Sequence, residues 1–255
     1  MRTIAKALFL SLFTAIAASN LFCFESKVVS DTFYSRSLRR EMPYAVYLPY
    51  KKADTRVYPV IYMLHGMSDH FSTWQPEAHI KQMLDNLIRS GKIKPIIAVF
   101  PEGERSYYYN SAQGLWEDYI IFDVFDFMGK NYPIKKGADN RAILGISMGG
   151  SGAMRLALKF PSMFSYVFGL SGIYDPGYMR YELSLASKKR LSNLRIYFWA
   201  GDNDSAGKYA EKLDAFFTAK KVPHSFELRP GKHDWKQWNP EIKKALMIFG
   251  KKKTK

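Results

Sequence analysis

The run Gly145-Ile146-Ser147-Met148-Gly149-Gly150 contains a candidate nucleophile. It lies where a short apolar run (residues 141–145) is followed by a helical pattern (residues 148–160). A sharp strand-to-helix turn forces its middle residue into a strained backbone conformation, and flanking glycines avoid the clash that a Cβ would cause there. The pattern therefore predicts that Ser147 is exposed beside the first turn of a helix, whose dipole favours a developing negative charge.

A serine hydroxyl needs a neighbouring base to become a nucleophile, and histidine is the usual choice. In sheets that present a serine in this way, the acid and then the base follow it along the chain. Only His224 and His233 follow Ser147. His224 lies in an extended run (residues 223–228) that is typical of an edge strand. His233 lies in the loop that opens the last helical pattern, from which its ring can reach the turn, so His233 is the predicted base.

The acid that orients such a base is expected just after a buried strand, where parallel sheets build their sites. Asp202 and Asp204 directly follow the apolar run 194–200, and spacing alone leaves both open. A calcium loop starting at Asp202 is excluded, because its fifth and twelfth positions are Ala206 and Leu213, which offer no side-chain oxygen. The three residue types together predict acyl transfer without a metal or a cofactor.

Acyl transfer also needs backbone N–H groups that stabilise the oxyanion. One is expected from Met148, directly after the serine. The other is expected from the segment Met63-Leu64-His65-Gly66-Met67, where Gly66 lets the backbone approach a substrate. We interpret His65 as a residue that shapes this loop rather than as a base.

The elements that hold these residues alternate between strand-like and helical patterns. Short apolar runs without strict alternation are typical of strands buried on both faces of a parallel sheet. The predicted fold is a mostly parallel α/β sheet with helices on both faces and antiparallel strands at its N-terminal side. Predicted strands cover 27–38, 42–48, 60–64, 96–100, 142–145, 166–170 and 194–200, and helical faces recur over 80–88, 206–217 and 235–249.

Composition limits the class of protein. The chain has 255 residues, of which 47% are hydrophobic and 24% charged, which suits one folded α/β domain and excludes wholesale disorder. A single cysteine, Cys23, excludes internal disulfides and a cysteine-based zinc site. The net charge is +15, yet no nucleic-acid-binding motif is present, so we expect contact with an anionic cell envelope rather than nucleic acid. Oligomeric state cannot be predicted.

Residues 1–22 are predicted to be a signal peptide. Arg2 and Lys6 precede an apolar stretch that is too short to span a bilayer, and residues 15–17 fit a cleavage site after Ala17. An uncleaved anchor and a lipid-modified Cys23 are the alternatives, although Phe22 is large for the residue before a lipidated cysteine. The remaining chain, 23–255, is predicted to be one catalytic domain with a basic tail at 251–255, located in the periplasm or secreted.

Taken together, the motifs resemble the esterase D-like "putative esterase" family of α/β-hydrolases. This family includes feruloyl and acetyl-xylan esterases, S-formylglutathione hydrolases and mycolyltransferases. The resemblance runs from about Arg36 to Phe249. It rests on residues 62–67 (YMLHGM) with Trp74, 100–103 (FPEG) with Tyr108, 116–119 (WEDY), 145–150 (GISMGG), 201–204 (GDND) and 231–235 (GKHDW).

The resemblance implies roles for individual residues. Ser147 corresponds to the nucleophile, His233 to the base, and Met67 and Met148 to the oxyanion N–H donors. The family's acid follows its glycine by three residues, which favours Asp204 over Asp202. Two subgroups fit poorly. Residues 67–69 (MSD) replace the cysteine and threonine of S-formylglutathione hydrolases, and the mycolyltransferases have aspartate at the position of His65.

The expected function is therefore a secreted serine carboxylesterase that acts on small or sugar-linked acyl esters. The first alternative is an acyltransferase that passes the acyl group to an alcohol of an envelope glycan or lipid. The second is a non-catalytic protein that binds the envelope through its positive charge. Two further motifs are predicted near the site. Residues 107–110 (YYYN) form either a pocket wall or a packed loop, and Glu117 is expected to brace loops near Ser147.

Overall fold

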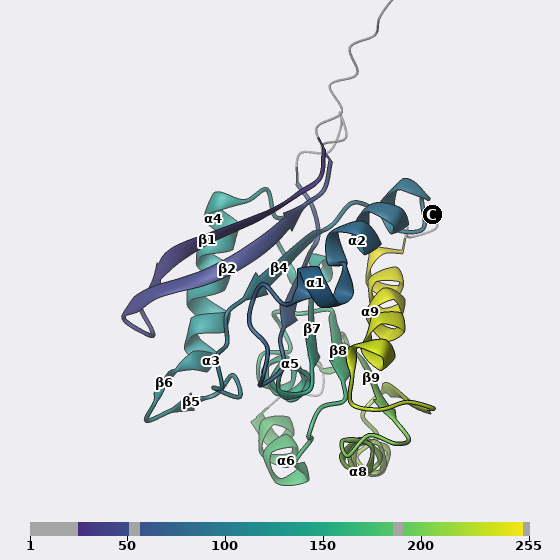
Figure 1. The fold of residues 1–255 in the computed structure, drawn as a ribbon. Helices are drawn as coiled ribbons and strands as arrows, with labels where there is room; N and C mark the ends of the chain where they lie inside the picture. The colour runs from purple at the N-terminus through teal and green to yellow at the C-terminus, as the bar shows by residue number, and fades with distance from the viewer. Residues whose placement is uncertain (1–24, 51–56, 186–190, 252–255) are drawn as a thin grey trace, which may run out of the picture.

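The computed structural model describes residues 25–50, 57–185 and 191–251 of the chain. Eight strands form one sheet in the order β1-β2-β4-β3-β7-β8-β9-β10, and all neighbours from β4 to β10 are parallel (Figure 1). Strands β1 and β2 form an antiparallel hairpin, and β2 also pairs antiparallel with β4. The strands are β1 (Lys27–Ser35), β2 (Arg40–Leu48), β3 (Val60–Leu64), β4 (Ile97–Pro101), β7 (Arg141–Ile146), β8 (Tyr166–Leu170), β9 (Arg195–Gly201) and β10 (His224–Arg229).

The predicted fold class is confirmed, and most predicted strands end within about two residues of the observed ends. The first strand is the exception, because it ends at Ser35 instead of residue 38. The Ser35 hydroxyl and the Ser37 N–H both donate to Asp123 Oδ2, at 2.6 and 2.8 Å. Arg39 then takes a positive φ of 55°. These contacts fold residues 36–39 into a turn.

Helices cover both faces of the sheet, and β3 shows why. Its alternate residues Val60, Tyr62 and Leu64 belong to one core cluster, and Ile61 and Met63 to the other. Because side chains of a strand point to opposite faces in turn, each face needs its own apolar cover. One layer contains α4 (Phe125–Asn131), α5 (Met148–Lys159) and α8 (Gly207–Ala219), and the other contains α1 (Trp74–Ala78), α2 (Ile80–Arg89) and α9 (Trp235–Gly250).

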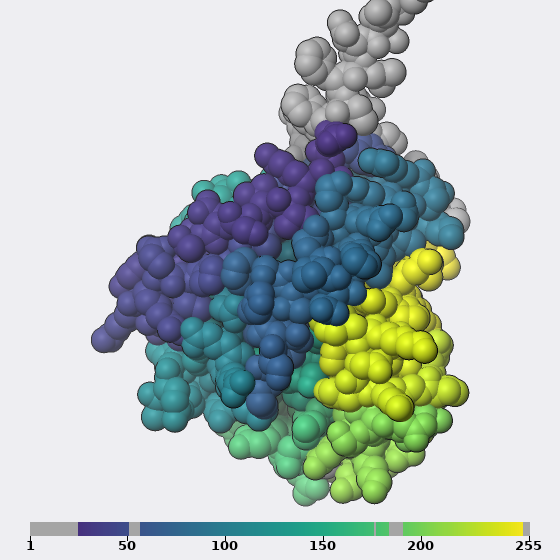
Figure 2. All heavy atoms as spheres, viewed as in Figure 1, coloured from purple at the N-terminus to yellow at the C-terminus, as the bar shows by residue number. Residues whose placement is uncertain are grey.

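The space-filling view shows the face formed by the β1–β2 hairpin, by α1 and α2, and by α9 (Figure 2). The α9 surface lies beside α1 and α2, with which α9 is in contact. Within the described residues, no helix is long and apolar enough to cross a membrane.

Several shorter elements lie in the connections between the strands of the sheet. Residues 110–115 form the small hairpin β5 (Asn110–Ser111) and β6 (Gly114–Leu115). A continuous helical stretch follows, made of α3 (Trp116–Asp118), the π-helix η1 (Tyr119–Val124) and α4. The elements that were not predicted include α1, the β5–β6 hairpin, the short 3₁₀ helix η2 (Ala138–Asn140) and α6 (Pro176–Leu185), which packs on α5.

Candidate active site

Ser147 occupies the tight turn between β7 and α5. Its φ of 50° and ψ of −118° lie outside the usual regions for a residue with a side chain. Its N–H donates to the Leu170 carbonyl at 2.8 Å, which holds the turn on β8. A Cβ at Gly149 would collide with the Leu64 carbonyl, and one at Gly145 would collide with Gly149. The glycines therefore permit the close approach of strand and helix that keeps Ser147 in this conformation.

His233 lies in the loop between β10 and α9, as predicted from its position before the last helix. Its Nε2 is 2.8 Å from Ser147 Oγ, and its Nδ1 is 2.8 Å from Asp204 Oδ1. The ring also packs edge-on against Trp238, with centroids 5.0 Å apart. The Trp238 indole is fixed in turn by a 2.9 Å hydrogen bond from its Nε1 to Ser171 Oγ. The structure thus brings Ser147, His233 and Asp204 together in one series of hydrogen bonds.

Asp204 is buried in the turn that follows β9. Its Oδ1 accepts hydrogen bonds from the His233 ring and from the Ala206 N–H, the latter at 2.7 Å. Burial disfavours the charged form, but the hydrogen bonds, first of all that from His233, outweigh it and lower the pKa of Asp204. The carboxylate is therefore ionised at neutral pH and stabilises positive charge on the neighbouring imidazole.

Asp202 lies close in sequence but binds elsewhere. Its Oδ1 accepts from the Gly231 N–H at 3.1 Å and from the Asn203 side chain at 2.9 Å. Its own N–H donates to the Arg229 carbonyl at 2.8 Å. Asp202 thus ties the turn after β9 to the loop that carries His233, and it does not contact the imidazole ring.

His224 is at the start of β10, the edge strand of the sheet, as predicted. Its Nε2 is 2.9 Å from Asp214 Oδ1, and its Nδ1 donates to the Val222 carbonyl at 2.7 Å. Both ring nitrogens are therefore engaged away from Ser147.

The two predicted oxyanion donors belong to residues that line the same cavity as Ser147. Met148 is the first residue of α5, so its N–H has no acceptor within the helix. Met67 follows Gly66, whose backbone approaches the serine so closely that a Cβ there would lie 3.5 Å from Ser147 Cβ. Met67 and Met148 both line the cavity that opens at Ser147.

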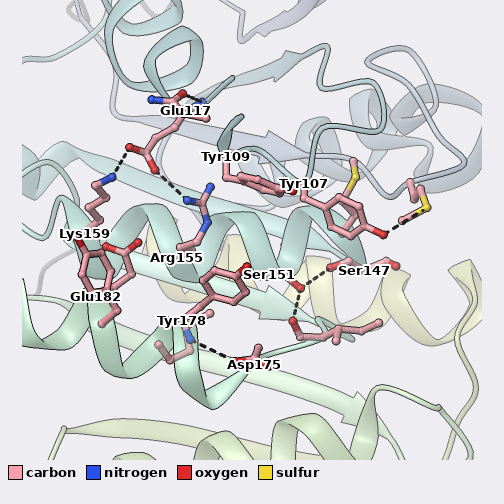
Figure 3. A pocket seen from close by; sticks show the side chains of 16 residues that line it. Tyr107, Tyr109, Glu117, Ser147, Ser151, Arg155, Lys159, Asp175, Tyr178 and Glu182 are labelled. Atoms are coloured by element: carbon pink, nitrogen blue, oxygen red, sulfur yellow. Dashed lines mark hydrogen bonds and ion pairs between the residues drawn. The ribbon is translucent and has the colours of Figure 1, made fainter. Parts of the chain in front are cut away.

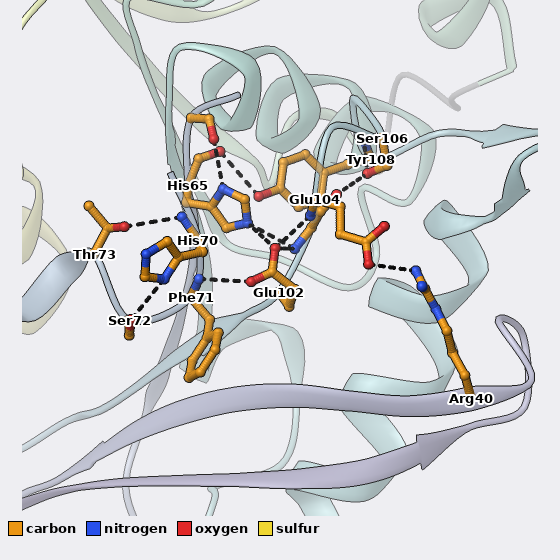
Figure 4. Close-up of polar contacts among 12 residues, drawn as sticks. Arg40, His65, His70, Phe71, Ser72, Thr73, Glu102, Glu104, Ser106 and Tyr108 are labelled. Carbon is orange, nitrogen blue, oxygen red and sulfur yellow. Dashed lines mark hydrogen bonds and ion pairs between the residues drawn. The ribbon is translucent and has the colours of Figure 1, made fainter. Parts of the chain in front are cut away.

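A buried imidazole–carboxylate pair supports the loop that carries Met67 (Figure 4). His65 Nδ1 donates to the Gly66 carbonyl at 2.7 Å, and its Nε2 lies 3.0 Å from Glu102 Oε1. Glu102 also accepts from the N–H groups of Phe71 and Glu104, at 3.1 and 2.6 Å. Burial opposes ionisation of Glu102, but the bonds from His65 and these N–H groups outweigh it and lower its pKa to about 2.

His65 was interpreted from the sequence as a loop-shaping residue, and this geometry agrees with that interpretation. Glu102 had no role assigned from the sequence. The available signal was the segment 100–103 (FPEG), which spans the end of β4 and places a carboxylate at the carboxyl end of a strand adjacent to β3.

A cavity of about 580 Å³ extends from Ser147 along α5 (Figure 3). Tyr107 and Tyr109 form one wall, and Tyr108 between them is fully buried and donates to the His65 carbonyl at 3.1 Å. Of the two alternatives left open for residues 107–110, a pocket wall describes Tyr107, Tyr109 and Asn110, and packing inside the protein describes Tyr108. The opposite wall comes from α6 and the loop before it, through Ile173, Tyr178, Met179, Tyr181 and Glu182.

Glu117 lies at the far end of this cavity. It pairs with Arg155 NH1 at 2.9 Å and with Lys159 Nζ at 2.6 Å, and both partners project from α5. Arg155 also donates to the Tyr108 carbonyl. Glu117 therefore braces the 107–110 loop against α5, in agreement with the expectation from the sequence.

The sheet, its helical layers and a serine in the turn between a strand and a helix define an α/β-hydrolase. The chain matches the family described as "Putative esterase" over residues 35–249, and it belongs to this family of carboxylic-ester hydrolases.

Three similar proteins illustrate the relationship. An endo-1,4-beta-xylanase/feruloyl esterase of Xylanibacter ruminicola is 33% identical over 167 residues, which cover 59% of this chain and 23% of that protein. An acetyl esterase of Caldicellulosiruptor saccharolyticus is 24% identical over 88% of this chain and 98% of its own length. Among solved structures, a ferulic acid esterase is 26% identical, with a TM-score of 0.80, and the match covers 89% of this chain and 98% of that one.

Proposed function

We propose that the chain is a serine carboxylesterase that hydrolyses small or sugar-linked acyl esters through an acyl-enzyme on Ser147. The observation that carries the proposal is the series of hydrogen bonds from Asp204 through His233 to Ser147 Oγ, at the mouth of an elongated cavity. Relatives described as a feruloyl esterase and an acetyl esterase support the ester class.

The proposed reaction uses side chains and backbone groups of the chain alone. His233 Nε2 takes the proton of Ser147 as Oγ attacks the ester carbonyl, and Asp204 stabilises the imidazolium. The Met67 and Met148 N–H groups hold the oxyanion. The intermediate then collapses to the acyl-enzyme while His233 gives its proton to the departing alcohol. Water, activated by the same imidazole, releases the acid.

Ser147→Ala tests this proposal. It should lower kcat by roughly 10³-fold or more, because the serine works with its partners as one unit. The substrates are p-nitrophenyl esters from acetate to palmitate, together with methyl ferulate. A fluorophosphonate probe should label the wild type but not the variant. If the variant keeps about a tenth of the wild-type rate, the assignment is wrong.

Transfer to an alcohol is the second candidate for the deacylation step. The His233 side chain is 36% exposed, so an acceptor larger than water can approach its Nε2. Product analysis with glycerol added in increasing amounts separates the two activities. A glyceryl ester that outweighs the free acid would identify a transferase.

The proposal also includes the location of the protein outside the cytoplasm. The predicted signal peptide at residues 1–22 and Cys23 lie outside the described residues, as does most of the basic tail. We propose a periplasmic or secreted enzyme that favours contact with an anionic envelope, because cleavage removes Arg2 and Lys6 from a chain of net charge +15 and leaves +13. Mass spectrometry of the N-terminus of the exported protein tests the predicted cleavage after Ala17.

A further inference from the structure

The two edges of the sheet at which its parallel strands end and begin differ in charge. The strands from β4 to β10 are parallel, so their carboxyl ends share one edge, where Ser147 and His233 lie, and their amino ends share the opposite edge. Around the site, exposed carboxylates accompany the exposed cations. Glu104 pairs with Arg40 at 2.8 Å, and Asp234 is exposed beside His233.

The opposite edge carries six exposed basic side chains, which we call the basic face. They lie where helices end and strands begin: Arg89, Lys92, Lys94, Lys135, Lys136 and Lys251. None of the six forms an ion pair with a carboxylate of the described residues. In the same part of the chain, the exposed carboxylates at this edge are Glu25, Asp139 and Asp214, and Asp214 is bound to His224. Positive charge therefore dominates this edge.

Backbone contacts gather the cations that follow α2 and α9. The Lys94 N–H donates to the Gly250 carbonyl at 2.9 Å, which places Lys94 beside Lys251 at the end of α9. The Lys92 N–H donates to the Leu87 carbonyl at 3.0 Å, so the chain turns back on the last turn of α2 before it reaches Lys94. The ends of two helices in one layer thus present their basic side chains together.

The start of β3 connects this group to the lysines before β7. The Lys135 N–H donates to the Tyr58 carbonyl at 2.7 Å, and the Ile97 N–H donates to the Pro59 carbonyl at 2.9 Å. Residues 57–59 therefore lie between the segment that carries Lys94 and the segment that carries Lys135. The basic face is continuous across the starts of three neighbouring strands.

The basic face is extended in two directions. Along the sheet it spans β4, β3 and β7, which lie about 4.8 Å apart. Across the sheet it reaches from the ends of α2 and α9 in one helical layer to the segment after α4 in the other. A single phosphate or one polymer strand would meet only part of this array. A bilayer surface with anionic headgroups can meet all of it, and such surfaces attract lysine and arginine.

Both ends of the described chain lie at this edge. In the hairpin, Lys27 pairs with Leu48, and β2 runs antiparallel to β4, so β1 begins where the parallel strands begin. Lys251 opens the basic tail, 251–255. Figure 1 shows the start of β1 and the C-terminus on one side of the molecule and β5, β6 and α6 on the other. The chain before residue 25 thus starts from the side that carries the basic face.

We infer that the basic face docks the protein on an anionic phospholipid bilayer, with Ser147 on the side that faces away from the lipid. The inference rests on the part of the proposed function that places the protein outside the cytoplasm. A docked enzyme keeps its active site open to substrates that arrive from the aqueous side.

Vesicles test the docking directly. The exported protein is sedimented with vesicles of phosphatidylglycerol and phosphatidylcholine in equal amounts, and with vesicles of phosphatidylcholine alone. It should bind the anionic vesicles at low salt. Binding should be lost on the neutral vesicles and in about 0.5 M NaCl, because salt screens contacts between exposed charges.

Two triple variants with the same net charge locate the docking face. Lys92→Gln, Lys94→Gln and Lys136→Gln together should lower the partition coefficient roughly 100-fold, because each cation at an anionic surface contributes about a fivefold factor. The matched control replaces three exposed cations at the carboxyl edge by glutamine: Arg105, Lys208 and Lys236. It should change partitioning less than about threefold. Circular dichroism checks the fold of both variants.

Labelling of Ser147 reports the orientation. A fluorophosphonate probe should react equally fast with free and vesicle-bound protein, and Ser147→Ala should bind vesicles as the wild type does. Slower labelling of the bound protein would overturn the orientation.

Three results would overturn the docking face or its partner. Equal losses in the two triple variants would show diffuse attraction without a specific face. Equal binding to neutral and anionic vesicles would exclude recognition of headgroup charge. Binding to soluble dextran sulfate without binding to vesicles would identify a polymer as the partner instead. A protein that binds vesicles but hydrolyses no ester would refute the proposed esterase activity and leave the docking face intact.

Discussion

Two imidazole–carboxylate pairs flank Ser147, and they are built almost alike. His233 and Asp204 meet at 2.8 Å, and His65 and Glu102 meet at 3.0 Å. Both carboxylates are nearly buried and both have lowered pKa values. The difference lies in exposure, because the His233 side chain is 36% exposed and that of His65 is fully buried.

The two histidines also differ in the partner of the ring nitrogen that does not face the carboxylate. In His233 it faces Ser147 Oγ, whereas in His65 it is bound to the Gly66 carbonyl. In the proposed reaction a proton moves through the first ring, while the second ring holds a loop in place. A histidine paired with a carboxylate is thus not enough to identify a base. The partner and the solvent access of the other nitrogen decide the role.

The largest expected difference in activity is between variants of His233 and of His224. His233→Ala should lower kcat/KM for a p-nitrophenyl ester by roughly 10³-fold or more. His224→Ala should stay within about twofold, because its ring binds Asp214 and the Val222 carbonyl. Steady-state kinetics of both variants check this. Equal losses would remove the distinction drawn between the two rings.

The next comparison is between two neighbouring acids. Asp204→Asn should cost roughly 10²- to 10⁴-fold in kcat, because an amide favours the wrong tautomer of His233. Asp202→Asn should cost much less, because Asp202 acts only through the Gly231 N–H and the loop. The two variants are assayed side by side with circular dichroism as a folding control. A larger loss at Asp202 would reverse the assignment.

Substitutions in the buried His65–Glu102 pair should change mainly the stability of the fold. The folded-state pKa of Glu102 is about 2, below its usual value of 4.5. Its contribution to stability is therefore present above about pH 4.5 and is lost as the pH falls through about 2. Glu102→Gln should lower Tm by roughly 5 °C at pH 7. The difference from wild type should shrink steadily between about pH 5 and 2 in thermal melts, and a pH-independent difference would contradict the linkage.

The smallest expected effect concerns a partly exposed pair. Asp214 is 42% exposed where it meets His224, so solvent weakens their attraction. Asp214→Asn should change Tm by less than about 2 °C, measured beside Glu102→Gln under the same conditions. A loss as large as that of Glu102→Gln would show that burial is not what separates the pairs.

Sequence patterns predicted the strands and turns whose conformation depends on residues close to one another in the chain. The strands at residues 60–64 and 166–170 appear with their predicted ends, because short apolar runs between turn residues can satisfy both faces of a sheet. The tight turn at Ser147 was found for a similar reason, since its glycines mark the close approach of backbone segments within a few residues.

Contacts between distant segments could not be derived from such patterns. Spacing left Asp202 and Asp204 open, because both follow β9 and only the return of the 231–234 loop shows which one meets the imidazole. The pairing of His65 with Glu102 spans 37 residues and two strands. Helix α6 was missed because its residues face a cavity and a partly exposed surface, so they lack a clear apolar stripe.

Helix α5 also sets a length scale. Ser147, the proposed nucleophile, is its N-cap residue and Lys159 is its last residue, and both line the cavity. Because a helix neither stretches nor shortens without breaking its hydrogen bonds, α5 fixes the distance between Ser147 and the far end of the cavity. Moving the terminal side chain by one residue would rotate it by about 100° out of the cavity, so the depth of the cavity can change only in steps of whole turns, about 5.4 Å each.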